Sequence, residues 1–172
     1  MSSNQLATVE QPKAIVGLSI TKDKAEKLLS SSARSIPSAG DYWSPQEGET
    51  KKVIVFGMAE LLAQQGDKKD LKPHILMGEV KINNGIMSTV NITNCSARLV
   101  SGIRSLLYIP LSSGEYVYMA DGSIIESEQL PITAIVAGRD IVAISYMGKR
   151  KNSSNVYLSD RWSINKLVAV EL

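Results

Sequence analysis

Alternating apolar and polar positions are densest between residues 51 and 92, and they predict strands. Residues 51–58, Lys-Lys-Val-Ile-Val-Phe-Gly-Met, have the β-branched and aromatic content of a strand. Residues 74–82 and 86–92 are two further runs of this kind. Asn84-Gly85 lies between them and tolerates the positive φ angles of a tight turn. The pattern therefore predicts one strand followed by a hairpin.

The alternating pattern breaks after residue 93, where helical spacing replaces it. Leu99, Ile103, Leu106 and Leu107 recur as on one face of a helix, and Asn94 is suited to cap its N-terminus. A helix is therefore predicted within residues 94–107.

Residues 60–65 favour one or two helical turns, and residues 66–73 read as a charged loop outside the core. Two apolar runs, residues 140–147 and 163–170, predict the final strands. Between the helix and these strands, residues 108–131 contain turn signals and a short Tyr-Val-Tyr run. They predict a small inserted hairpin.

Residues 1–40 are expected to be an extension of the folded domain, which spans residues 41–172. Residues 21–29 predict a short helix with Thr21 as N-cap, and residues 15–20 a short strand or apolar anchor. Residues 30–40 are rich in Ser, Gly and Pro and predict a linker. The extension is either an arm that docks on a neighbouring copy, giving a homo-oligomer, or a flexible tail.

Composition narrows the class of protein. The chain has 172 residues, of which 44% are hydrophobic and 21% charged, as in globular proteins. The chain has no signal-peptide pattern and no apolar run long enough to span a bilayer, so we expect a cytoplasmic protein without a membrane partner. Cys95 and His74 are the only cysteine and histidine. An internal disulfide is therefore impossible, and neither a metal site nor a cofactor is expected.

Charge is distributed unevenly, although the net charge is only +2. Residues 115–128 carry four acids and no base, whereas residues 149–166 carry five bases and one acid. Tyrosine and tryptophan alternate with these bases, a combination that suits single-stranded nucleic acid because cations bind phosphate and flat rings stack on bases. An ordinary solvated loop remains the alternative for the Lys149-Arg150-Lys151 run. The candidate binding residues are Lys149, Arg150, Lys151, Arg161, Trp162, Tyr146, Lys51, Lys52 and Trp43.

The predicted order of strand, strand, strand, helix, strand, strand resembles the OB-fold, a five-stranded Greek-key barrel with a helix between strands three and four. Locally, residues 42–50, 94–103 and 146–152 resemble small single-stranded-DNA-binding proteins of phages and mobile elements, which act in DNA replication. The resemblance covers residues 41–172. It implies a mainly β barrel that binds single-stranded DNA through the loop containing Lys149, Arg150 and Lys151, and through the face of strands two and three.

Two features depart from that pattern. The hairpin of residues 75–92 has no aromatic residue for base stacking, and the C-terminus lacks the acidic tail with which many such proteins recruit replication enzymes. A structural or assembly module, with the N-terminal extension as a docking arm, is therefore the second hypothesis.

An enzyme is the weakest of the three classes. The sequence has no phosphate-binding Gly-Lys-Ser/Thr loop and no Gly-x-Ser-x-Gly elbow. His74 has no partner acid or nucleophile in the pattern and is expected to be structural. Glu126 and Glu128 are expected to be a solvated acidic face.

Overall fold

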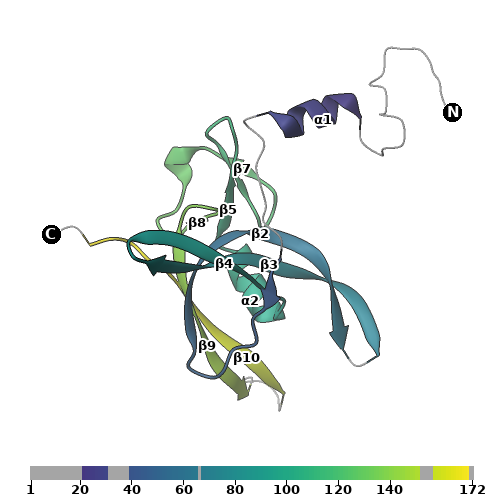
Figure 1. Cartoon of the computed structure of the whole chain (residues 1–172), viewed down its shortest axis with the longest axis vertical. Coiled ribbons are helices and arrows are strands. Elements are labelled where there is room, and N and C mark those ends of the chain that lie inside the picture. Colours follow the sequence, from purple (N-terminus) through teal and green to yellow (C-terminus); the bar gives the residue numbers. More distant parts are fainter. Residues whose placement is uncertain (1–20, 31–38, 66, 152–156, 171–172) are drawn as a thin grey trace. The chain divides into compact units, whose positions relative to one another are not determined.

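The computed structural model describes residues 21–30, 39–65, 67–151 and 157–170. The chain divides into two compact units, Met1–Ser35 and Ile36–Leu172. In the first unit, α1 (Lys22–Leu29) begins after Thr21, whose Oγ1 accepts a hydrogen bond from the Lys24 N–H at 3.3 Å (Figure 1). The predicted helix and its cap are confirmed. The predicted strand at residues 15–20 and most of the predicted linker lie outside the described residues.

The second unit is mainly β, as predicted. Its larger sheet has six strands in the order β1-β4-β3-β2-β9-β10 (Figure 1). β1 pairs with β4 in parallel, and the other neighbours are antiparallel. The strands are β1 (Asp41–Tyr42), β2 (Thr50–Gln65), β3 (Lys68–Asn83), β4 (Ile86–Asn94), β9 (Ile141–Lys151) and β10 (Leu158–Lys166).

The β2–β3 hairpin corrects the prediction of helical turns at 60–65 and a loop at 66–73. Residues 60–65 and 68–73 are strand, and the pairing of β2 with β3 continues from Val53↔Glu79 to Gln65↔Lys68. Leu, Ala and Gln favour a helix locally, but the backbone ladder begun in the core extends along both chains and outweighs that propensity. The hairpin ends outside the core, where Leu62 and Leu71 are paired and exposed.

The predicted β3–β4 hairpin is confirmed. Asn83 pairs with Ile86, and the two residues between them have φ angles of 53° at Asn84 and 78° at Gly85. These are the angles that an Asn-Gly turn accepts. β3 begins at Lys68, however, so His74 lies inside a strand rather than at its start. Its side chain is buried, and Nδ1 hydrogen bonds to the Lys72 carbonyl at 2.8 Å.

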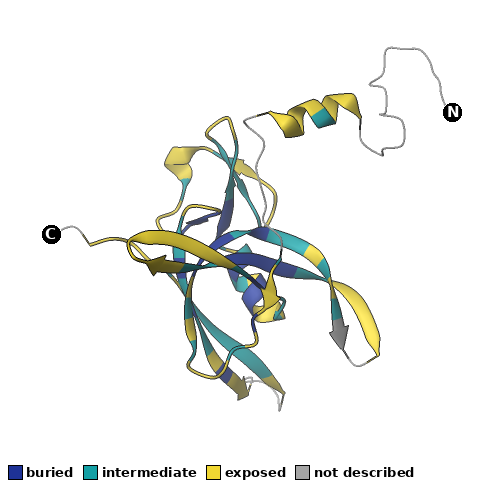
Figure 2. Cartoon of the chain, in the orientation of Figure 1, coloured by how far each residue is buried: buried dark blue, intermediate teal, exposed yellow. Residues whose placement is uncertain are grey.

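The core lies between the sheet and α2 (Ala97–Arg104), the helix predicted from the apolar spacing. Leu99, Val100 and Ile103 are buried on its inner face. α2 packs against β3 and β10, closely enough that a Cβ at Gly102 would lie 2.8 Å from Ile164 Cδ1. Figure 2 shows burial concentrated where β2 and β3 pass this helix, with the hairpin ends exposed.

Asn94 does not cap α2, contrary to the prediction. The N-cap position is Ser96. Asn94 is buried and donates to the Trp43 carbonyl at 2.9 Å, while its Oδ1 accepts from the Ser96 N–H at 2.8 Å. The side chain therefore joins the end of β4 to the segment after β1, because a buried amide must satisfy its hydrogen bonds.

The predicted hairpin at residues 108–131 proves to be a second sheet, in the order β7-β6-β5-β8. Its strands are β5 (Leu107–Pro110), β6 (Tyr116–Tyr118), β7 (Ile124–Ile125) and β8 (Ile135–Val136), with a 3₁₀ turn, η1 (Ser127–Gln129), between the last two. Tyr108 and Tyr118 stack across β5 and β6 with their ring centroids 4.7 Å apart. The segment is longer than predicted because β8 pairs in parallel with β5, a contact between residues distant in sequence.

The predicted five-stranded barrel is not confirmed. The main sheet has six strands and remains open in the described residues, with β1 and β10 at its edges.

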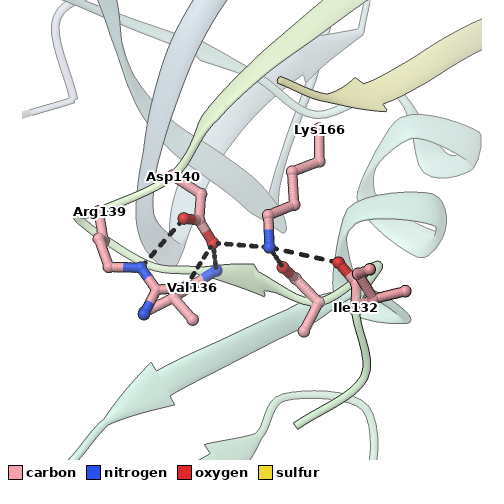
Figure 3. A network of polar contacts seen from close by, with 6 residues as sticks. Ile132, Val136, Arg139, Asp140 and Lys166 are labelled. Atoms are coloured by element: carbon pink, nitrogen blue, oxygen red, sulfur yellow. Dashed lines mark hydrogen bonds and ion pairs between the residues drawn. The ribbon is translucent and has the colours of Figure 1, made fainter. Parts of the chain in front are cut away.

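A polar network around Asp140 joins β8, β9 and β10 (Figure 3). Asp140 Oδ2 accepts from the Val136 N–H at 2.7 Å and lies 3.5 Å from Lys166 Nζ, while Oδ1 accepts from Arg139 Nε at 3.0 Å. Lys166 also donates to the Ala134 carbonyl at 2.8 Å. Burial alone would raise the pKa of Asp140, but the hydrogen bonds from Arg139 and Val136 and the charge of Lys166 outweigh it and lower the pKa.

We predict that Asp140→Asn lowers the free energy of unfolding at pH 7 by about 1–3 kcal/mol, because it removes a charged acceptor from the buried Val136 N–H and the largely covered Lys166 ammonium. The folded pKa lies below the ordinary value of 3.8, so the stabilisation is complete above that pH and is lost as the pH falls through the folded pKa. Urea denaturation of both proteins at several pH values measures the difference. Glu128→Gln, an exposed control, should change little. An Asp140→Asn deficit that persists unchanged in strong acid would contradict the role of the charge.

Candidate nucleic-acid interface

The three consecutive cations lie at the outer end of the β9–β10 pair. Lys149 is opposite Asp160, Arg150 opposite Ser159, and Lys151 opposite Leu158. All three side chains are exposed. They belong to the end of strand β9, and the rest of the basic loop, residues 152–156, lies outside the described residues.

Two of these cations have carboxylate partners. Lys149 Nζ lies 3.1 Å from Asp160 Oδ1, and Arg150 Nη1 lies 3.2 Å from Glu47 Oε1. The lysine and arginine side chains are 59% and 54% exposed, respectively. Ion pairs with cations at such exposure stabilise the fold only weakly, and salt screens them.

Asp160 connects the cations to the rest of the site. Tyr146 Oη donates to Asp160 Oδ1 at 2.8 Å, and Ser96 Oγ donates to Oδ2 at 3.3 Å. Burial would raise the pKa of Asp160, but the hydrogen bonds from Tyr146 and Lys149 outweigh it and lower the pKa. Conversely, donation to Asp160 raises the pKa of Tyr146. At neutral pH the carboxylate is charged and the phenol is protonated.

Trp43 is part of the core, and Trp162 is partly buried against it. Trp43 is 5% exposed, and Trp162 packs against it edge-to-face with the ring centroids 5.6 Å apart. Trp162 Nε1 donates to Ser96 Oγ at 3.1 Å, and Tyr146 is tilted against the same indole at 4.9 Å. These contacts hold the Trp162 ring between Trp43 and Tyr146.

The remaining candidate residues are dispersed. Lys51 is 20% exposed, pairs with Glu79 at 3.0 Å and lies 5.8 Å from the Trp43 ring centroid. Lys52 is exposed and, as the next residue of β2, faces the opposite side of the sheet. Arg161 is half-buried on β10. The structure therefore brings Tyr146, Lys149 and Trp162 together near Asp160 and separates Lys52 from Lys51.

Asp160 also lines a cleft of about 610 Å³. Its lining includes Tyr42, Lys72, Arg104 and Asp160, contributed by β1, β3, α2 and β10. Tyr42 is 49% exposed. The cleft therefore combines two cationic side chains with one accessible aromatic ring.

The Tyr42 hydroxyl is held in place by Cys95. It accepts from the Cys95 N–H at 3.3 Å and lies 3.6 Å from Cys95 Sγ. Burial, helped by the side-chain contact with Cys95, raises the pKa of Tyr42 to about 12. The ring is therefore neutral and fixed at physiological pH.

The sequence pattern did not reveal this cleft. The sequence predicts a loop at residues 66–73, which include Lys72, and it gives no sign that Tyr42 and Arg104 lie beside this residue. The meeting of these residues depends on the pairing of β1 with β4 and the packing of α2 against β3 and β10. Neither contact leaves a local signal.

Comparison of the chain with models of protein families, with curated proteins and with solved structures found no match. Among the described residues, no helix is long and apolar enough to cross a membrane, and no three His, Cys, Asp or Glu side chains gather as a metal site would require.

We predict that Trp162→Ala lowers the free energy of unfolding by about 2–4 kcal/mol, because it opens a cavity beside Trp43. Lys151→Ala, at an exposed position, should change it by less than about 0.5 kcal/mol. Chemical denaturation measures both. A stable Trp162→Ala variant that has lost nucleic-acid binding would instead make Trp162 a stacking platform.

Proposed function

We propose that the chain binds single-stranded nucleic acid, in particular single-stranded DNA, and that it does so without catalysing a reaction. The observation that carries the proposal is the continuity of the site. The exposed cations of β9 and the cationic, aromatic cleft adjoin the same residue, Asp160, which is bonded to Lys149 and lines the cleft. A phosphate backbone following β9 into the cleft would meet Lys149, Arg150 and Lys151 first and Lys72 and Arg104 afterwards, with the Asp160 carboxylate between them.

Binding would proceed largely by exchange of ions. Phosphates would replace Asp160 at Lys149 and Glu47 at Arg150, and Lys151 would supply a further charge. Release of condensed counterions from the nucleic acid would favour binding and make it sensitive to salt. In the cleft, Lys72 and Arg104 would hold phosphate while a base stacks on Tyr42.

The arrangement of strands supports an OB-like scaffold for this activity. Numbered without the two-residue β1, the long strands of the main sheet lie in the order three-two-one-four-five. A helix follows the third of them and packs against β10. In OB-folds, loops at one side of such a barrel bind oligonucleotides. We propose that α2 and the Trp43–Trp162 contact link the two sides of the open sheet in place of full closure.

An assembly or protein-interaction module is the second candidate. The burial of Trp43, the partial burial of Trp162 and the absence of aromatic residues from the β3–β4 hairpin favour it, since base stacking contributes about 1–3 kcal/mol per base in proteins that bind single strands. On this hypothesis the scaffold would carry interaction surfaces, and the N-terminal extension would dock on neighbouring copies.

Replacing Lys149, Arg150 and Lys151 together with Ala tests the proposed function. We predict that affinity for a single strand falls about tenfold or more and that the slope of log K against log salt decreases by about 2, because roughly three phosphate contacts disappear. Fluorescence anisotropy at several salt concentrations measures both.

The matched control removes the same charge elsewhere. Lys22, Lys24 and Lys27 are exposed on α1, and changing all three to Ala alters the net charge equally. This control should retain most of the affinity. If both triple variants lose the same affinity for the single strand, the loss comes from net charge alone, and a binding site at β9 is contradicted.

Variants of Tyr42 distinguish the contribution of base stacking from that of electrostatic attraction. Tyr42→Ala should weaken binding by about 1–3 kcal/mol because a base loses its ring partner, whereas Tyr42→Phe keeps the ring and should retain most of the affinity. Thermal denaturation of both variants verifies that they are folded under the assay conditions. Equal affinities for the Ala and Phe variants would remove Tyr42 from the interface.

A further inference from the structure

β4 presents an open strand edge. It pairs with β3 along Ile86–Asn94, and β1 covers its other side at Ile92 and Thr93. Gly40, just before β1, lies against the backbone carbonyl of Asn91 on the same side. Among the described residues, nothing pairs with that side of residues 86–90. The Trp43 N–H donates to the Thr93 carbonyl at 2.8 Å, so the backbone of Thr93 faces outward. By alternation, the backbone groups of Met87, Thr89 and Asn91 face outward too.

This edge lacks the usual protection against strand pairing. Natural edge strands carry charges, prolines or bulges that prevent another strand from adding to them. Residues 86–91, Ile-Met-Ser-Thr-Val-Asn, contain no charge and no proline, and their pairing with β3 shows no bulge. Ile86, Met87 and Val90 are 71%, 59% and 50% exposed. On the neighbouring strand, Lys81 is paired with Glu79 at 3.3 Å.

We propose that β4 pairs antiparallel with β4 of a second copy of this chain, about a twofold axis at Ser88. In an antiparallel pair, a residue whose backbone N–H and C=O face the partner strand lies opposite another such residue. Odd-numbered residues of one β4 therefore lie opposite odd-numbered residues of the other, and even-numbered residues opposite even-numbered ones. A centre at Ser88 uses residues 86–90 of both copies. A centre at Thr89 would place Ile86 against Ile92, where β1 already lies, and a centre at Met87 would draw the turn residues into the pairing.

The sequence of β4 is complementary to itself in this register. Ile86 lies opposite Val90 of the second copy, twice by symmetry, and Ser88 lies opposite Ser88 between these apolar pairs. On the other face, Met87 lies opposite Thr89 and beside the exposed Ile82 of β3. Cross-strand apolar pairs stabilise a sheet, and no like charges meet across the axis. The two six-stranded sheets become one continuous sheet, and this inference does not depend on nucleic-acid binding.

Cysteine crosslinking tests the register. In a Cys95→Ser chain, Ser88→Cys places two thiols directly opposite each other, within the Cα separation that a disulfide spans. Met87→Cys and Thr89→Cys, one residue to either side, are the matched controls. Under oxidised glutathione, Ser88→Cys should give at least about fivefold more covalent dimer than either control. Equal yields at the three positions, or the highest yield at a control, would overturn the proposed pairing.

Charged substitutions in β4 test the same contact without covalent crosslinking. Ile86→Lys with Val90→Lys places like charges opposite each other across the axis and should weaken dimerisation by about tenfold or more. Ile86→Lys with Val90→Glu places opposite charges there and should restore the dimer. Sedimentation at several protein concentrations distinguishes them, with circular dichroism as the check on folding. A wild-type chain that remains monomeric, or two variants that dimerise equally, would overturn the proposal.

Discussion

The apolar face of the main sheet must be shielded from water. The way it is covered determines where most other elements of the second unit pack. Val53, Val55, Ile75 and Val142 have almost no exposed surface because α2 and two indole rings close over them. Covering such a face is the dominant favourable term in folding. It also buries Trp43 and covers part of Trp162. In the proposed function, a nucleic acid would therefore be held mainly by charge.

Asp160 links this structural requirement to the proposed activity. Its carboxylate binds β9 through Tyr146 and Lys149 and reaches Ser96, just before α2. Ser96 Oγ in turn accepts a hydrogen bond from the indole N–H of Trp162. One polar chain thus runs from the surface cations to the core. The carboxylates of Asp160 and Glu47 hold Lys149 and Arg150 in place. In the proposed function, phosphate groups would take over these two cations.

Short sequence signals predicted the helices and turns that are determined by residues close together in the sequence. Thr21 caps a helix, Asn84-Gly85 closes a hairpin, and the spacing of Leu99 and Ile103 defines α2. Where distant residues decide, prediction from the sequence was wrong or silent. Residues 60–65 became strand because β3 pairs along them, and residues 107–136 became a sheet because β8 returns to β5. The cleft of Tyr42, Lys72 and Arg104 requires four elements to be in place. The cations at β9 were visible in the sequence, but their carboxylate partners were not.

The most direct test of the central claim, that charge around Asp160 binds single strands, is a titration of the wild-type chain. A labelled single strand of about thirty nucleotides, long enough for one OB-like domain, is titrated at low and at high salt beside a duplex of the same sequence. The account predicts tight binding of the single strand at low salt, marked weakening at high salt, and weaker binding of the duplex. Absence of binding at low salt, or equal binding of both forms, would contradict it.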